Sequence, residues 1–211
     1  MVGRKDEWFR KSTWSAADER DFRACLKRAR PASRPQYLRI QAVHLLDNGL
    51  PEPALGLLDE FLAGPEDLLW TQGHALRARA LTDLGRPDEA LATYRTAIET
   101  QRRRPNVQAY APLEFAELVV ALRRRDLFPE ALDVLELHGP DPFPEINYRE
   151  AAVRAQVADA LGDRVAARLH ARRALQAAAE AKAPFARHPD AGLVRVVDPE
   201  VYAKLESMCA A

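Results

Sequence analysis

The chain has 211 residues, which suits one domain or an array of about eight to ten helices of ordinary length. Lys and Arg total 31, as do Asp and Glu, so the formal net charge is zero and no overall field draws the protein to nucleic acid or to an anionic membrane. The hydrophobic fraction of 47% is ordinary for a globular protein and is enough for a sizeable core.

The cysteines and the N-terminal residues indicate the cellular compartment. Cys25 and Cys209 lie near opposite ends of the sequence without a C-x-x-C pair, so they supply neither a disulfide framework nor a set of zinc ligands. The residues before Trp8 are charged and lack the apolar stretch of a signal peptide. No apolar run approaches the ~20 residues that span a bilayer. We therefore expect a cytoplasmic, reduced protein that does not span a membrane.

Residues 1–33 are predicted to form an aromatic leader and a first helix. Ser15 and Asp18 have the spacing of a capping box, and the helix is expected to run from there to about Arg30. Trp8, Phe9 and Trp14 would form an exposed patch if they were left in water. They are expected to pack over the first helices and cover the open core of the fold, or else to bind a partner.

Proline and glycine residues divide residues 34–183 into four predicted helix hairpins. The first pair is expected at 35–47 and 51–62, and the second has one helix from 64 to 85 and another that begins at 87. The third pair has one helix that begins at 112 and another at 129–137, and the fourth is expected at 146–161 and 163–183. Pro51 and Pro87 suit the first position of a helix, where a missing N–H costs nothing. The second helix of each pair carries an alanine early in its sequence: Ala54, Ala90, Ala131 and Ala167.

These alanines are 36, 41 and 36 residues apart, and a spacing in the mid-thirties is typical of stacked helical hairpins. A small residue at one recurring position indicates that two helices cross closely there. The longer spacing marks an insertion around residues 102–106, so the array is expected to be irregular between its second and third hairpins.

Residues 34–183 resemble the tetratricopeptide repeat. The resemblance is carried best by the segment from Leu84 to Leu91 with Tyr94 and Ala97, where small and large residues follow that family's pattern. It implies an all-α, right-handed superhelical array of antiparallel helix hairpins. The family's usual apolar residue before the small position of the first helix is replaced here by Gln41, Arg77 and Arg154 in three hairpins.

The resemblance also implies a concave surface that holds a peptide or a partner protein. By position, that surface would include Arg39, Val43, Gln72, Arg79, Asp83, Glu117, Arg123, Arg149 and Gln156. The pattern by which some relatives clamp a terminal carboxylate is missing. The mixture of charges suggests a ligand recognised by arginine–carboxylate pairs, although the same residues could simply be a solvated face.

Two alternatives remain open for partners. The clusters Arg102–Arg104, Arg123–Arg125 and Arg172–Arg173 could form a phosphate-binding strip in a nucleic-acid-associated regulator, but zero net charge and the lack of interleaved aromatic residues argue against it. An arginine-rich outer face could instead support a homodimer.

The sequence offers no enzyme motif. The five histidines show no i, i+4 pair, and there is no phosphate loop, nucleophile elbow or dinucleotide-binding turn. We therefore expect no catalysis, no cofactor and no metal.

Residues 184–211 are predicted to form an apolar extended segment followed by a helix that begins at Pro199 and is capped by Asp198. This segment could cover the end of the array or fold into the concave groove in place of a ligand. The need to cover an open core favours the cap.

Overall fold

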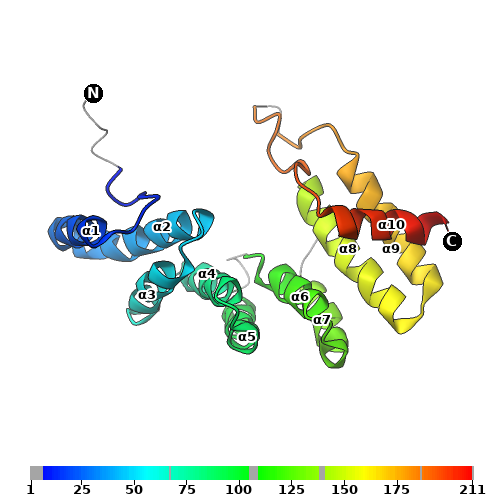
Figure 1. Cartoon of the computed structure of the whole chain (residues 1–211), viewed down its shortest axis with the longest axis horizontal. Coiled ribbons are helices and arrows are strands. Elements are labelled where there is room, and N and C mark those ends of the chain that lie inside the picture. Colours follow the sequence, from blue (N-terminus) through cyan, green and yellow to red (C-terminus); the bar gives the residue numbers. More distant parts are fainter. Residues whose placement is uncertain (1–6, 67, 105–108, 138–140, 186, 211) are drawn as a thin grey trace. The chain divides into compact units, whose positions relative to one another are not determined.

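The computed structural model describes residues 7–66, 68–104, 109–137, 141–185 and 187–210 (Figure 1). Over these ranges the chain forms ten α-helices and two short 3₁₀ helices, Pro31–Ser33 and Arg125–Leu127, and contains no strand. The chain divides into two compact units, Met1–Ala111 and Pro112–Ala211. The division falls close to the place where the alanine spacing lengthens. The insertion predicted at residues 102–106 itself lies partly outside the described residues.

The first unit contains five helices: α1 (Ala16–Arg28), α2 (Arg34–Asp47), α3 (Pro51–Leu62), α4 (Trp70–Asp83) and α5 (Pro87–Arg103). Helices α2 to α5 pack against one another in chain order. Pro51 and Pro87 occupy the first positions of α3 and α5, as the sequence predicts. Ala54 and Ala90 are fully buried. Their small side chains allow α3 and α5 to pack closely against their partners.

The expected start of α4 is wrong by about one and a half turns. The sequence predicts a helix from residue 64, but α4 begins at Trp70. A Cβ atom at Gly73 would overlap the Phe61 ring, so the α4 backbone lies directly on α3 at this point. Just after α3 ends, the Gly64 N–H donates to the Phe61 carbonyl at 3.3 Å.

The aromatic leader packs on α1 and α2. The ring of Trp8 lies 5.5 Å from that of Phe22 in α1 and 4.8 Å from that of Tyr37 in α2, measured between centroids. Phe9 also contacts Tyr37, and Trp14 contacts Phe22. The large apolar side chains of the leader thus cover the start of the first unit.

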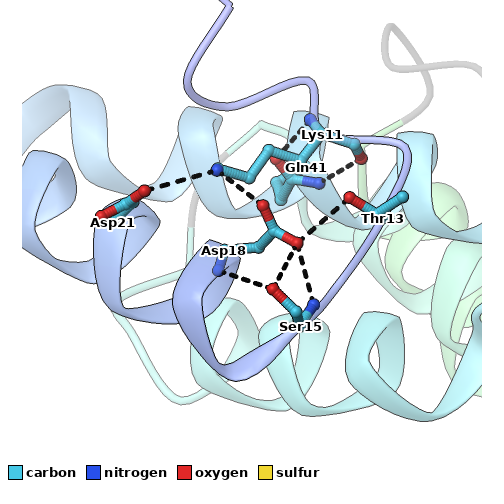
Figure 2. A network of polar contacts seen from close by, with 6 residues as sticks. All are labelled: Lys11, Thr13, Ser15, Asp18, Asp21 and Gln41. Carbon is cyan, nitrogen blue, oxygen red and sulfur yellow. Dashed lines mark hydrogen bonds and ion pairs between the residues drawn. The ribbon is translucent and has the colours of Figure 1, made fainter.

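A polar network holds the end of the leader in place (Figure 2). Ser15 and Asp18 form the predicted capping box at the start of α1. The Ser15 backbone N–H, the Lys11 ammonium and the hydroxyls of Ser15 and Thr13 all bond to the Asp18 carboxylate, and they hold the pKa of this group well below its usual range. The buried Gln41 side chain pairs with both backbone groups of Lys11, accepting from its N–H at 2.9 Å and donating to its carbonyl at 2.8 Å.

The second unit contains α6 (Ala111–Ala121), which begins at the last residue of the first unit, followed by α7 (Phe128–Leu135), α8 (Pro144–Leu161), α9 (Arg164–Ala178) and α10 (Pro199–Ala210). Gly162 ends α8 with φ at 82°, a left-handed conformation that glycine adopts without a steric penalty. The Asp163 side chain then caps α9 by accepting from Ala166 N–H at 2.9 Å.

Helix α9 is shorter than predicted, since it ends at Ala178 and not near Ala183. The Glu180 side chain accepts the backbone N–H of Lys182 at 3.0 Å, a local bond that replaces continuation of the helix.

The C-terminal segment packs on the last hairpin. Asp198 caps α10 by accepting from Glu200 N–H, as predicted. Leu205 and Met208 of α10 are buried with Ala171 and other residues of α8 and α9. Figure 1 shows α10, in red, lying across these two helices. In this arrangement α10 covers the α8–α9 core.

Candidate functional site

The first unit holds five of the nine predicted surface residues. They lie on α2 and α4, which contact each other: Arg39, Val43, Gln72, Arg79 and Asp83. All are half-buried except Asp83, which is exposed. Arg79 forms an ion pair with Asp47 at 3.0 Å, which links α4 to the end of α2. This surface is polar, and one of its arginines is already neutralised.

The second unit holds the other four predicted residues, and the structure brings them together. Two adjoining cavities of about 320 and 460 Å³ lie beside α6, α8 and α10 and share Val120, Gln156 and Val201 as lining residues. We call the two cavities together the groove. Glu117 and Arg149 line the smaller cavity, Arg123 lines the larger, and Gln156 lines both.

The wall of the smaller cavity is mainly aliphatic. Three parts of the chain supply its aliphatic side chains. They are Val120 and Ala121 of α6, Ala152 and Val153 of α8, and Val196 and Val201 of the C-terminal segment. Each cavity falls in the size range of about 300–1,000 Å³ that ligand pockets occupy. The smaller one suits an apolar group.

Glu117 and Arg149, which both line this cavity, form an ion pair with each other. Arg149 donates from Nε to Glu117 Oε1 at 2.7 Å and from Nη2 to Oε2 at 2.6 Å, a bidentate pair that joins α6 to α8. Desolvation alone would lower the pKa of Arg149, but the hydrogen bonds and charge of Glu117 outweigh it and raise the pKa above its usual value. The pair therefore forms part of the groove wall but leaves no unpaired charge of its own for a ligand.

Tyr148 contributes an unsatisfied polar group to the same cavity. Its side chain is only 6% exposed, and its hydroxyl is buried without a hydrogen-bond partner among the described residues. Burial raises the pKa of Tyr148, and the negative charge of Asp198 raises it further. The hydroxyl therefore stays protonated and can donate to an acceptor on a ligand.

The larger cavity is lined by three basic residues, Arg123, Arg125 and Lys204, and by two acidic ones, Asp159 and Glu200, which leaves an excess of positive charge. Lys204 of α10 is neutralised by Asp159 at 3.0 Å. Arg123 and Arg125 form no ion pair with any carboxylate in the described part of the chain. Arg123 has φ at 54°, in the left-handed region, which costs a non-glycine residue about 1–2 kcal/mol. Strained residues of this kind are common at binding sites.

Sequence reasoning missed the contribution of the C-terminal segment to this site. Val201 and Lys204 line the groove, as do Val196, Asp198 and Glu200. The sequence leaves open whether this segment is a cap or an occupant of the groove. In the structure it packs on α8 and α9 as a cap, and its other side forms a wall of the groove. Tyr148 was also missed, because nothing in the sequence shows that its hydroxyl lacks a partner among the described residues.

The three arginine clusters do not form one strip within a unit. Arg102–Arg104 belong to the first unit, whereas Arg123–Arg125 and Arg172–Arg173 belong to the second. Arg104 pairs with Glu66 at 3.4 Å, and Arg124 pairs with Asp126 at 2.9 Å.

Among the residues that the structure describes, no group of three or more His, Cys, Asp or Glu side chains is placed to hold a metal ion. None of the helices in the described ranges combines the length and apolar character needed to cross a bilayer. Comparison of the chain with protein-family models, with curated proteins and with solved structures found no match.

Proposed function

We propose that this protein is a non-catalytic interaction module whose hairpins form a tetratricopeptide-like, right-handed array, and that the groove binds an extended peptide segment of a partner. The observation that carries the proposal is the groove itself. It combines an aliphatic cavity with a buried Tyr148 hydroxyl and two arginines, Arg123 and Arg125, and none of these polar groups has a hydrogen-bond or ion-pair partner among the described side chains.

This combination favours a particular kind of peptide. An apolar side chain fills the aliphatic cavity, a peptide carbonyl accepts the Tyr148 hydroxyl, and an acidic side chain reaches Arg123 and Arg125. The Glu117–Arg149 pair is already formed without ligand. Because this part of the wall is preorganised, less ordering entropy is lost on binding.

Support for the array comes from the hairpins. Each of the four recurring alanines is buried, and neighbouring helices pack in chain order, α2 on α3, α3 on α4, α4 on α5 and α8 on α9. A stacked arrangement of this kind presents a continuous surface of helices to a partner.

The experiment is selection of a displayed random-peptide library on the full chain, followed by affinity measurement on synthetic peptides. We expect selected peptides to share an apolar residue near one or more acidic residues. The variant Arg123→Glu/Arg125→Glu should weaken their binding by about tenfold or more, because it replaces attraction with repulsion. Arg20→Glu on exposed α1 is the matched control and should leave affinity unchanged.

Two results would overturn the proposal. One is the absence of any peptide that distinguishes the wild-type chain from the double variant. The other is steeply salt-dependent binding of a DNA duplex or an RNA strand that the double variant abolishes, which would favour a nucleic-acid-associated regulator.

A further inference from the structure

A second surface, separate from the groove, lies on α9 and α10. Val165 and Leu169 stand one turn apart on α9 and are 82% and 48% exposed, and Leu161 at the end of α8 is 62% exposed. Val165 and Leu169 line a hollow of about 750 Å³, which is also lined by Met208 of α10. Large aliphatic side chains grouped beside a hollow indicate a place where another surface can dock.

Three arginines border these aliphatic residues. Arg164, Arg168 and Arg172 follow one another at four-residue intervals, so they lie on one face of α9, and all three line the hollow. None of them forms an ion pair with a carboxylate of the described residues. The one acidic residue of the lining, Asp159, is already paired with Lys204 at 3.0 Å.

Stability does not explain the position of Arg164. It is the first residue of α9, where the helix dipole disfavours positive charge, and the first turn of α9 has no acidic residue. The first turn of α5, by contrast, carries Asp88 and Glu89. Arg34 also begins a helix, but its guanidinium donates to the Lys27 and Ala29 carbonyls, whereas that of Arg164 bonds to no described residue.

We infer that this surface, the face of α9 and α10 that includes Arg164, Val165, Arg168, Leu169, Arg172 and Met208, docks an acidic amphipathic helix of another protein. The apolar stripe of the partner helix packs on Val165 and Leu169, and its Asp or Glu residues pair with the arginines. This inference is independent of the groove and of the peptide proposed for it.

The shape and charge of the surface argue for this occupant over two others. A bilayer is flat and would meet the ridges of α9 without filling the hollow beside it. A second copy related by a two-fold axis would bring the arginine rows of the two chains together and cause repulsion. A helix fits the hollow beside α9, because a ridge on one helix packs into a groove on another.

The test uses two displayed libraries of helical peptides with the same apolar stripe, flanked by Asp and Glu in one and by Lys and Arg in the other. The full chain should enrich the acidic library only. Arg164→Glu/Arg168→Glu and, separately, Val165→Asp/Leu169→Asp should each lower the affinity of the selected peptides by about tenfold or more. Arg173→Glu, on α9 outside the hollow, is the matched control and should keep full affinity.

Loss of folding does not account for the expected loss of binding. All four substituted positions are exposed, and acidic residues at 164 and 165 are stabilised by the helix dipole in the first turn of α9, so circular dichroism and the melting temperature should show an intact fold. Enrichment of both libraries or of neither would overturn the inference. Binding to phosphatidylserine vesicles or to a DNA duplex would also overturn it, if the same variants abolished that binding and left the affinity for the peptides unchanged.

Discussion

Gln41 and Tyr148 are both buried polar side chains, but they differ in how their polar atoms are satisfied. The Gln41 amide uses its oxygen and its nitrogen to bind the backbone of Lys11. The Tyr148 hydroxyl has no partner in the described structure. A buried polar group that is bonded stabilises the fold modestly, while one that is left unbonded costs its full desolvation. The two residues should therefore respond to substitution in opposite directions.

Replacing Gln41 with leucine should destabilise the first unit. Gln41→Leu leaves the N–H and carbonyl of Lys11 without these partners, and the expected loss in the free energy of unfolding is about 1–3 kcal/mol. The leader should also detach more readily, which trypsin cleavage after Arg10 or Lys11 would detect. Gln36→Leu, at an exposed position of α2, is the control and should change neither quantity. Equal cleavage rates in the two variants would show that Gln41 does not hold the leader.

Removing the Tyr148 hydroxyl should stabilise the second unit. Tyr148→Phe breaks no described hydrogen bond and removes a buried donor without a partner, so the free energy of unfolding should rise by about 1 kcal/mol. The same variant should weaken binding of peptides that use the hydroxyl. Urea denaturation and peptide titration on one preparation measure both effects. A loss of stability would mean that the hydroxyl is satisfied after all.

At the scale of helices, the three departures from the tetratricopeptide pattern have a common structural role. Gln41, Arg77 and Arg154 occupy the same position in their hairpins, where the resemblance leads one to expect an apolar residue. Each forms polar bonds with another element: Gln41 with Lys11, Arg77 with Asp59 and Thr93, and Arg154 with Glu136. Polar bridges thus join neighbouring elements at these three positions.

Local signals in the sequence predicted the helix starts well. The capping box at Ser15 and the prolines at 51 and 87 act within one turn, so they can be recognised without knowledge of the fold. The start of α4 could not be found in this way, because it depends on the contact of Gly73 with Phe61 on a neighbouring helix.

The resemblance to the tetratricopeptide repeat places Glu117, Arg123, Arg149 and Gln156 on one surface, together with five residues of the first unit. In the structure these four residues line the groove. The sequence did not show that Glu117 and Arg149 pair with each other, because that bond depends on how far α6 lies from α8. The contribution of α10 was not predictable either, since α10 lies far from α6 in the sequence.

Helix α10 should contribute strongly to the stability of the second unit. Leu205 is fully buried in the α8–α9 core, and Leu205→Ala should lower the free energy of unfolding by about 2–5 kcal/mol. Leu161→Ala, at an exposed leucine of α8, is the control and should have little effect. Thermal unfolding followed by circular dichroism measures both variants. Similar melting temperatures for the two would contradict the role of α10 as a cap.

For the whole molecule, the division into two units has a consequence that spectroscopy can follow. All three tryptophans, Trp8, Trp14 and Trp70, belong to the first unit. Tryptophan fluorescence therefore reports unfolding of the first unit, and far-ultraviolet circular dichroism reports unfolding of both. If the units unfold independently, Leu205→Ala should shift the dichroism transition and leave the fluorescence transition where it is.

The pH dependence of stability should also divide between the units, because the described residues of each unit include one histidine with a lowered pKa. Burial lowers the pKa of His74 in the first unit, with Arg77 adding to the effect, and burial followed by Arg154 and Arg173 lowers that of His170 in the second. The unfolded chain takes up these protons near the ordinary histidine pKa of 6.5, whereas the folded chain takes them up only at lower pH. Protonation therefore favours unfolding, and stability should fall as the pH drops below about 6.5.

Urea titrations at a series of pH values between about 8 and about 5 test this prediction in both units. His74→Gln should reduce the pH dependence of the fluorescence transition. At mildly acidic pH, His74 binds a proton in the unfolded first unit but not in the folded one, and the variant removes this difference. His170→Gln should leave that transition unchanged and reduce the pH dependence seen by circular dichroism. If His170→Gln altered the fluorescence transition as strongly as His74→Gln does, the two units would have to unfold as one.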